Sequence, residues 1–326
     1  VPERQEHEAV THENTPEAPR PLSERVIAHA SRRRRLEERF FGRDARHEWV
    51  QIDWFDGFLV LVLTGFLRCA GLHAKARRNT LDLRLESREL PVPGLPPALD
   101  GLRLLHLSDL HLGRTLPEHT EAVCRLLDGV SADLCVITGD LRFGHFGPFD
   151  HVASAVRRIL GGLRLRCGAY AVLGNHDTVA LGESVERAGL RVLLNEGVSI
   201  NVDDAVLWIA GVDDPHLFKL DDLETALNGA PQGAFRMLLA HSPECADEAA
   251  KRGVGLYLCG HTHGGQIRIP FWGALLLNAR CPRGRDLGCW QTGTMVGHTS
   301  TGLGSTNALV RFGCPPEATM LTLRRA

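Results

Sequence analysis

The chain has 326 residues, which is enough for one large α/β domain and a shorter appendage. Its formal net charge is −2, so the overall charge does not indicate a protein that binds polyanions. Nine scattered cysteines form no CxxC pair, which argues against a disulfide framework and against a zinc knuckle.

The N-terminal part of the chain divides into two segments. Residues 1–21 are polar and rich in Glu, His and Pro, so we predict that they are disordered. No apolar stretch typical of a cleavable signal peptide follows the first residues. Residues 22–80 are predicted to be helical, first basic and then apolar. The run Arg32–Arg35 is open to two interpretations, a solvated helix face or a contribution to membrane binding.

The segment Trp54–Leu72 is the most apolar in the chain. Its uncharged core, Gly57–Leu67, has eleven residues. About 20 are needed to cross a bilayer. The segment suits a core helix, an interfacial helix or a docking face for a partner. Because a basic run precedes it, we favour peripheral membrane contact through residues 22–72 over a core helix, and we do not expect a spanning helix.

Residues 81–326 are predicted to form the catalytic domain. Leu81–Leu85 alternates like a strand, and the proline-rich Pro91–Gly101 predicts a loop. From Arg103 onward, short apolar strands alternate with helical stretches. The predicted strands are RLLHLS, DLCVIT, AYAVL, AVLWIAG, FRMLLA and GLYLC. Five of them end at a motif that contains Asp, Asn or His, and open α/β sheets place their ligand sites at such strand ends.

These five motifs together predict a dinuclear metal site. They are Asp109-Leu110-His111, Gly139-Asp140, Gly174-Asn175-His176-Asp177, His241 and Gly260-His261-Thr262-His263. Each motif is a weak signal alone, but their joint occurrence at strand ends is specific. Two close cations need a bridging anion such as a carboxylate to offset their repulsion. Carboxylate and imidazole ligands favour two divalent ions of Mn, Fe or Zn.

The spacing within the motifs fits this interpretation. Residues two apart at the end of an extended strand face the same side, so Asp109 and His111 are expected to converge on one metal. The same argument joins His261 and His263. Glycines precede Asp140, Asn175 and His261, and allow close approach of the backbone. The doublet Asp213-Asp214 before Pro215 is interpreted as a turn rather than as a further carboxylate site.

The motif order DxH, GD, GNHD, H, GHTH resembles the calcineurin-like metallophosphoesterases, from about Leu102 to the C-terminus. The resemblance implies a four-layer α/β/β/α sandwich with two mixed sheets. It also implies that His176 donates a hydrogen bond or a proton to the leaving oxygen and that Asp177 orients its imidazole. The implied ligands are Asp109, His111 and His263 for one metal, Asn175, His241 and His261 for the other, and Asp140 as the bridge between them.

Three longer stretches resemble a narrower bacterial branch whose members are often membrane-associated. They are LRLLHLSDLHLG, GHTHGGQIRIP and the tail STGLGSTNALVRFGCPPEATMLTL. Some relatives of that branch hydrolyse UDP-2,3-diacylglucosamine in lipid A biosynthesis. The resemblance therefore implies a cytoplasmic enzyme, peripheral to the inner membrane, with a lipid-linked substrate. The first hundred residues match this branch only loosely.

The expected reaction is hydrolysis of a phosphodiester or pyrophosphate bond by a hydroxide that bridges the two metals. The alternative is a broad-specificity phosphomonoesterase or a phosphoprotein phosphatase. A wide polar cleft would favour a protein substrate, and an apolar entry groove would favour a lipid. A non-catalytic binding module would be expected to lack a bridging or acid residue, and none is missing. No basic stripe with interleaved aromatics follows the Arg run, so no nucleic-acid partner is predicted.

Overall fold

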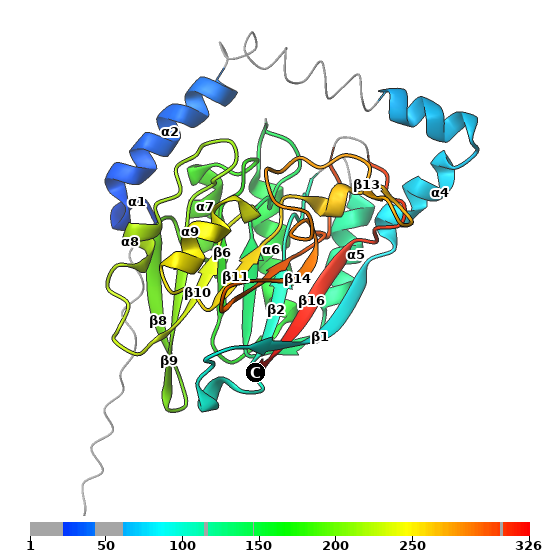
Figure 1. The fold of residues 1–326 in the computed structure, drawn as a ribbon. Helices are drawn as coiled ribbons and strands as arrows, with labels where there is room; N and C mark the ends of the chain where they lie inside the picture. Colours follow the sequence, from blue (N-terminus) through cyan, green and yellow to red (C-terminus); the bar gives the residue numbers. More distant parts are fainter. Residues whose placement is uncertain (1–21, 43–60, 114–116, 146, 307–308) are drawn as a thin grey trace, which may run out of the picture.

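Two six-stranded sheets lie at the centre of the molecule (Figure 1). The computed structural model describes residues 22–42, 61–113, 117–145, 147–306 and 309–326. The first sheet has the spatial order β1 (Arg84–Val92), β16 (Glu317–Arg325), β2 (Arg103–Leu107), β4 (Leu134–Thr138), β6 (Ala169–Val172) and β7 (Arg191–Val192). The second has the order β14 (Gly288–Thr292), β15 (Met295–Thr299), β11 (Leu256–Cys259), β10 (Phe235–Leu239), β9 (Ala205–Gly211) and β8 (Glu196–Val202).

The inner faces of the two sheets pack against each other. Leu104, Val136 and Val172 of the first sheet join the same buried apolar cluster as Ile209 and Leu258 of the second. The central strands are parallel within each sheet and are buried on both faces. This explains why they read as continuous apolar runs rather than as alternating patterns. All six strands predicted from Arg103 onward are present, as β2, β4, β6, β9, β10 and β11.

Helices cover both outer faces of the sheets. The first sheet carries α5 (Pro117–Leu127), α6 (Asp150–Gly162) and α7 (Val179–Glu186), and the second carries α8 (Leu223–Leu227) and α9 (Ala246–Lys251). Two short pairs complete the strands, β3 (Ser131–Ala132) with β5 (Arg164–Leu165) and β12 (Arg268–Ile269) with β13 (Gly273–Ala274). Each sheet contains both parallel and antiparallel pairs. The fold is the predicted four-layer sandwich.

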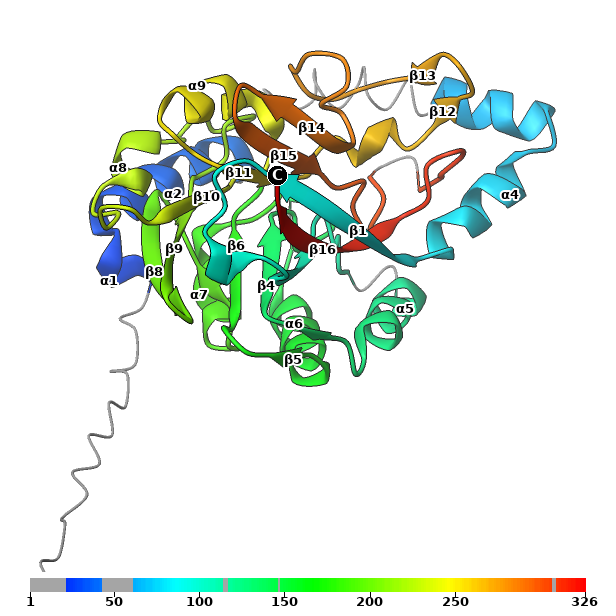
Figure 2. The same ribbon diagram turned by 60° about the horizontal axis from the view of Figure 1, so that its bottom comes forward.

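Helices of the N-terminal segment flank the sandwich on two sides (Figures 1 and 2). On one side lie α1 (Leu22–Arg25) and α2 (Ile27–Phe41), and on the other lie a helix at 61–69, α4 (His73–Arg78) and the 3₁₀ turn Asn79–Leu81. The predicted disorder of 1–21 and the first part of the apolar stretch at 54–60 fall outside the described residues. In the part of the chain that is described, no helix has both the length and the apolar character needed to span a bilayer.

The first strand differs from its predicted position. Leu81–Leu85 was predicted as a strand, but Leu81 ends a 3₁₀ turn and β1 begins at Arg84. The strand then continues into Pro91 and Val92, which were predicted to lie in a loop. A proline is tolerated here because β1 is an edge strand that, among the described strands, pairs only with β16, so one side of the strand needs no N–H donor.

Candidate metal centre

The five predicted motifs follow β2, β4, β6, β10 and β11, and they meet at one edge of the sandwich. Within each sheet these strands run parallel, so their carboxyl ends lie side by side. Face-to-face packing of the sheets then brings the two sets of strand ends together. The structure thus gathers side chains that lie up to 154 positions apart in the sequence, from Asp109 to His263.

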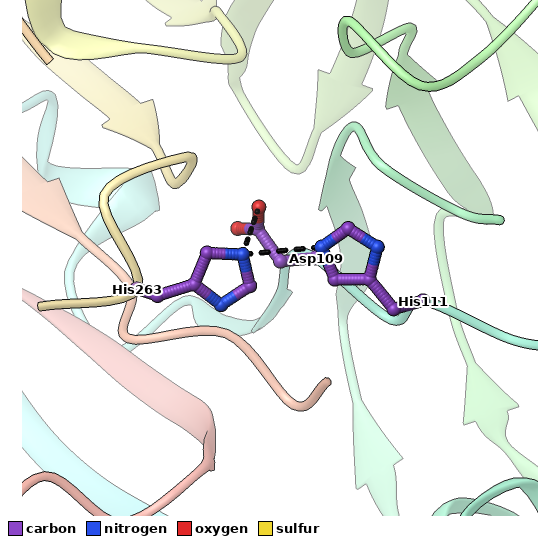
Figure 3. Close-up of side chains that lie close together, drawn as sticks. All are labelled: Asp109, His111 and His263. Carbon is purple, nitrogen blue, oxygen red and sulfur yellow. Dashed lines mark hydrogen bonds and ion pairs between the residues drawn. The ribbon is translucent and has the colours of Figure 1, made fainter. Parts of the chain in front are cut away.

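The first group of side chains lies around the end of β2. The Nε2 atoms of His111 and His263 are 3.1 Å apart, and Nε2 of His263 is 3.3 Å from Oδ1 of Asp109 (Figure 3). All three side chains are buried. A tetrahedral Zn²⁺ with bonds of about 2.1 Å separates its ligand atoms by about 3.4 Å. The group therefore has the size of a site for one cation.

The second group is joined to the first by Asp140. Its Oδ2 lies 3.8 Å from Nε2 of His111 and 3.4 Å from Nε2 of His241. Nε2 of His241 in turn lies 3.1 Å from Nδ1 of His261 and 3.0 Å from Oδ1 of Asn175. Asp140 thus stands between two clusters of donor atoms. The structure brings all seven predicted ligand residues together.

Hydrogen bonds on the far side of two imidazoles leave their Nε2 atoms available to bind a metal. Nδ1 of His111 donates to the carbonyl of Arg142 at 3.1 Å, and Nδ1 of His241 donates to the carbonyl of Thr138 at 2.8 Å. A carbonyl only accepts hydrogen bonds, so each Nδ1 carries a proton, and in the neutral ring that binds a metal the lone pair is then on Nε2.

Two further atoms that could bind a metal are buried without a hydrogen-bond partner among the described residues. They are Nε2 of His261 and Oδ1 of Asp109, which lies 3.3 Å from the imidazole of His263 but accepts no hydrogen bond from any residue that the structure describes. A buried polar atom without a partner costs about 1–3 kcal/mol. Divalent cations of the Mn, Fe or Zn type would satisfy such carboxylate and imidazole atoms. The residues present therefore fit a metal centre.

The backbone at the ligands adopts an unusual conformation. Positive φ angles, between 44° and 68°, occur at Asp109, His111, Asp140, His261 and His263. Residues other than glycine rarely adopt such angles, and they concentrate at functional sites where the surrounding structure enforces them. The turns after β2, β4 and β11 therefore aim these side chains at the centre at some cost in stability.

The glycines beside the ligands allow the loops to approach each other. A Cβ atom on Gly139 would lie 2.6 Å from Nδ1 of His241, and one on Gly174 would overlap the carboxylate of Asp140. A Cβ atom on Gly260 would overlap the hydroxyl of Ser108. This agrees with the prediction that the glycines before Asp140, Asn175 and His261 permit close approach of the backbone.

Burial and charge act against each other at the two carboxyl groups. Burial would raise the pKa of Asp140, but His241, His176 and His111 hold it well below its ordinary value. Burial raises the pKa of Asp109 to about 7, against the lowering effect of His241. A bound cation favours the ionised form of a carboxylate and would therefore stabilise both groups as ligands.

His176 lies beside the shared carboxylate, nearer to solvent than the other imidazoles. Its Nε2 is 3.8 Å from Oδ2 of Asp140, and its side chain is 13% exposed. Its ring stacks on that of His145, with the centroids 4.0 Å apart. With His111 and Asp140 it also forms a set of donor atoms close enough to hold an ion. The role of His176 as a proton donor rather than a ligand therefore stays a prediction.

The predicted contact between Asp177 and the imidazole of His176 is wrong for this structure. The carboxylate of Asp177 instead accepts backbone N–H bonds from Leu141 at 3.0 Å, Gly174 at 3.0 Å and Arg142 at 3.3 Å. Nδ1 of His176 is buried without a hydrogen-bond partner in the described part of the chain. Asp177 therefore ties the loop that follows β6 to the loop that follows β4.

Arg33 is a buried residue near the centre that was not predicted from the sequence. Arg33 of α2 is fully buried and donates to the carbonyls of Gly174 at 2.9 Å and Asp177 at 2.8 Å. These two carbonyls flank Asn175 and His176 in the chain. The run Arg32–Arg35 was interpreted either as a solvated helix face or as a membrane contact. Neither interpretation holds for Arg33, because its side chain is buried in the protein. Its neighbour Arg34 pairs with Glu183 at 2.5 Å.

The doublet Asp213-Asp214 has two different roles. Asp214 forms the predicted turn, because its carboxylate accepts the N–H groups of His216, Leu217 and Phe218. Asp213 is more than a turn residue, since it is fully buried and its carboxylate pairs with Arg33 at 2.5 Å and with His29 at 2.8 Å. The sequence showed no partner for it, because both partners lie about 180 positions earlier.

A family model described as calcineurin-like phosphoesterase matches residues 102–265. The chain is 32% identical over 239 residues to a Bacillus subtilis (strain 168) protein named uncharacterized metallophosphoesterase YkuE, which covers 71% of this chain and 82% of that one. It is 29% identical over 232 residues to a protein of Escherichia coli (strain K12) named phosphodiesterase YaeI. The aligned region covers 68% of this chain and 82% of the E. coli protein.

The chain is also similar to a longer Bos taurus protein, named transmembrane protein with metallophosphoesterase domain. The two are 34% identical over 262 residues, which is 73% of this chain but only 56% of the bovine protein. The family match begins just before β2 and ends after the last ligand motif, so it spans the whole set of gathered side chains. The chain therefore belongs to the calcineurin-like phosphoesterase family and is a metal-dependent hydrolase of phosphoesters.

Proposed function

We propose that the chain hydrolyses a phosphodiester or pyrophosphate bond at a centre of two divalent metal ions. The observation that supports this best is the position of Asp140, whose Oδ2 lies within 3.8 Å of His111 and within 3.4 Å of His241. A single carboxylate between two clusters of donor atoms suits two cations that share a ligand. Because the E. coli relative is named a phosphodiesterase, the proposal puts a diester ahead of a monoester.

Each side chain has a proposed task in this centre. When bound, the two metals would lower the pKa of a water molecule and offset negative charge on the phosphoryl oxygens. Asp140 would bridge the two ions. The other ligands would be Asp109, His111 and His263 for one ion and Asn175, His241 and His261 for the other. Asp177 would hold the loop that carries Asn175 and His176.

His176 is proposed to assist departure of the leaving oxygen. Its position at the solvent side of Asp140 supports this role, since a leaving group must exit toward solvent. We expect His176→Ala to keep both metals and to lose turnover by about 10²–10⁴-fold, the usual contribution of a positioned acid. The loss should grow with the pKa of the leaving group, because poor leaving groups need the proton most.

The measurement is turnover of a series of aryl phosphodiesters together with the metal content of the purified variant. His73→Ala is the matched control, because His73 lies in α4 and is not among the gathered ligand residues. Equal losses for good and poor leaving groups would contradict the role as an acid. A loss of one metal in His176→Ala would instead make His176 a ligand, as its place in one donor set allows.

The proposed substrate is lipid-linked, with UDP-2,3-diacylglucosamine and hence lipid A biosynthesis as the named candidate. It is supported by the exposed apolar side chains of Leu61, Val62 and Phe66 in the helix at 61–69, and by the name of the bovine relative. A cytoplasmic enzyme, peripheral to the inner membrane, would suit such a substrate. Residues 22–72 were predicted to touch the membrane, but Arg33 and Arg34 of this segment have protein partners. The proposed contact therefore rests on the later, apolar part.

A substrate panel tests the choice between lipid diester and the alternative, a phosphomonoesterase or phosphoprotein phosphatase. The Mn-loaded protein is assayed with UDP-2,3-diacylglucosamine, an aryl phosphodiester and an aryl phosphomonoester, in detergent micelles. We expect turnover of the first two to exceed that of the monoester. Fast monoester cleavage without turnover of the lipid would overturn the lipid proposal and favour the alternative.

A further inference from the structure

Two segments far apart in the sequence lie next to each other (Figures 1 and 2), and both expose apolar side chains. One is the helix at 61–69, where Leu61, Val62 and Phe66 are exposed. The other is the hairpin of β12 and β13 with its following loop, where the exposed apolar residues are Ile269, Phe271, Trp272, Leu275, Leu276 and Leu277. We call these two segments, together with α4, the apolar rim.

The hairpin presents two aromatic residues at its tip. Trp272 is 83% exposed and Phe271 is fully exposed. Phe271 also has a φ of +68°, a conformation that bulky residues rarely adopt. Neither side chain is buried in the protein, so packing within the fold does not account for two large aromatic residues at this tip. An exposed Trp beside a Phe is typical of side chains that enter the interfacial region of a bilayer.

A small buried cluster fixes the two segments relative to each other. Leu67 of the helix at 61–69 and Ala76 of α4 pack with Ile267 and Val310. The backbone N–H of Arg311 donates to the carbonyl of Ala76 at 2.8 Å. The apolar rim is therefore one surface rather than two independent loops.

The charged residues within the segments of the apolar rim are all basic. Residues 61–81 contain Arg68, Lys75, Arg77 and Arg78 and no acidic residue, and residues 267–283 contain Arg268, Arg280 and Arg283 and no acidic residue. Arg268 pairs with Asp286 at 2.6 Å, but Arg68 and the three basic residues of α4 are exposed. Exposed apolar side chains with basic neighbours suit an anionic lipid surface better than a neutral one.

The apolar rim is also connected to the metal centre. Arg268 at the base of the hairpin donates to the carbonyl of Gly264, next to the predicted ligand His263, at 2.8 Å. A Cβ atom on Gly265 would lie 2.5 Å from Cβ of Ala274 and 2.6 Å from the carbonyl oxygen of Leu276. The hairpin thus packs directly on the loop that follows β11. A membrane bound at the hairpin would lie beside the metal centre.

We propose that the apolar rim docks the protein on an anionic lipid bilayer, with Phe271 and Trp272 inserted at the interface. This extends the proposed membrane contact from the N-terminal segment to a hairpin of the catalytic domain. It deepens the proposed function, since it would bring the centre to a substrate held in the membrane. Binding to the bilayer is nonetheless measured without any substrate, so it can succeed or fail separately from the proposed reaction.

The test is co-sedimentation of the full chain with vesicles of phosphatidylglycerol and phosphatidylethanolamine, compared with vesicles of phosphatidylcholine alone. We expect binding to the anionic vesicles that weakens as salt is raised, because screening reduces attraction to surface charge. The double variant Phe271→Ser/Trp272→Ser should lower the partition coefficient about tenfold or more, since it removes the inserting side chains. Ile27→Ser is the matched control, because Ile27 is 65% exposed on α2, outside the apolar rim.

Turnover of a water-soluble aryl phosphodiester should be the same in the double variant and in the unchanged protein. That result would show an intact fold and leave the proposed reaction untouched. Equal vesicle binding by the double variant, or no preference for anionic vesicles, would overturn the docking proposal. It would also be overturned if light scattering showed that the double variant converts a dimer to a monomer without a change in vesicle binding, since the rim would then cover a second copy of the chain.

Discussion

Asp140→Ala is expected to lose both metals and nearly all phosphodiesterase activity. The carboxylate of Asp140 faces His111, His176 and His241, each with its Nε2 within 3.8 Å. Without it, two cations would stand close together with no anion between them. Metal Lewis acidity supplies several kcal/mol, and each 1.36 kcal/mol is tenfold in rate, so we expect a loss of roughly 10³-fold or more.

The measurement is the number of metal ions per purified chain together with turnover of an aryl phosphodiester. Asp140 Oδ1 also accepts the backbone N–H of His176 at 2.9 Å, so alanine would loosen that residue as well. Asp140→Asn separates the two effects, because an amide oxygen can still accept this bond but carries no charge. Asp203→Ala, an exposed carboxylate in a turn, is the control for the purification and the assay.

Variants that remove a ligand of only one of the two proposed ions make the comparison sharper. Asp109→Ala and Asn175→Ala each remove a ligand from only one proposed ion, so each should lower the metal content toward one per chain. Asp140→Ala alone should bring it toward zero. If Asp140→Ala retained two metals and normal turnover, the bridging assignment would be wrong. If Asp109→Ala also lost both metals, the division of ligands between the two ions would need revision.

Much of the centre could be predicted because its ligands sit at strand ends. A buried parallel strand is a continuous apolar run in the sequence, and the first polar residue after it marks the edge of the sheet. The motifs at Asp109, Asp140, Asn175, His241 and His261 were found in this way. The fold followed from the same motif order. The positive φ angles at several ligands have no sequence signal of their own, because Asp and His do not require them.

Contacts between distant segments could not be predicted. The family resemblance implied that Asp177 orients the imidazole of His176, but the carboxylate points back to the N–H groups of Leu141 and Gly174. Its direction depends on how the loops after β4 and β6 meet. Likewise, the exposure of Phe271 and Trp272 is visible only once the hairpin is placed, because an isolated apolar pair reads equally well as core.

Arg33 is the clearest case of a contact hidden from the sequence. Ala30, Arg33 and Glu37 are the buried residues of α2 and lie along one face of the helix. A face made of Arg and Glu has no apolar signal, and four consecutive arginines do not reveal which one is buried. The helix also lies outside the residues that the family model matches. Only the folded chain identifies which of the four arginines contacts the loop that carries Asn175 and His176.

We expect Arg33→Lys to lower turnover by about 10–100-fold, the usual cost of removing a group that orients a metal ligand. The guanidinium of Arg33 donates to the carbonyls of Gly174 and Asp177, and it pairs with Asp213 at 2.5 Å and with Glu37 at 3.1 Å. Lysine keeps the charge but cannot form this fork of bonds. The loop with Asn175 and His176 should then lose its fixed position while the fold remains.

A positioning role is separated from a purely structural one by what changes in the assay. Loss of position should lower kcat most for poor leaving groups, as in His176→Ala, and should weaken binding of the metal proposed for Asn175. Loss of stability alone would lower the melting temperature and leave turnover per folded molecule unchanged at low temperature. That second result would contradict the positioning role.

Three further variants keep this test decisive. Arg34→Met is the matched control, since Arg34 is the next residue of the same helix and its side chain is 43% exposed. Its turnover should stay within about twofold of the unchanged protein, because exposed ion pairs contribute little to stability.

Arg33→Met leaves Asp213 buried without its cation, a loss that costs about 3–5 kcal/mol and can prevent folding. The double variant Arg33→Met/Asp213→Asn removes the charge of Asp213 as well, and we expect it to fold, because the remaining carboxylate, Glu37, still accepts the N–H of Val179. It should still lack the bonds to Gly174 and Asp177, so its turnover should remain low while its stability recovers. Recovery of both together would show that α2 stabilises the molecule without positioning the catalytic loop.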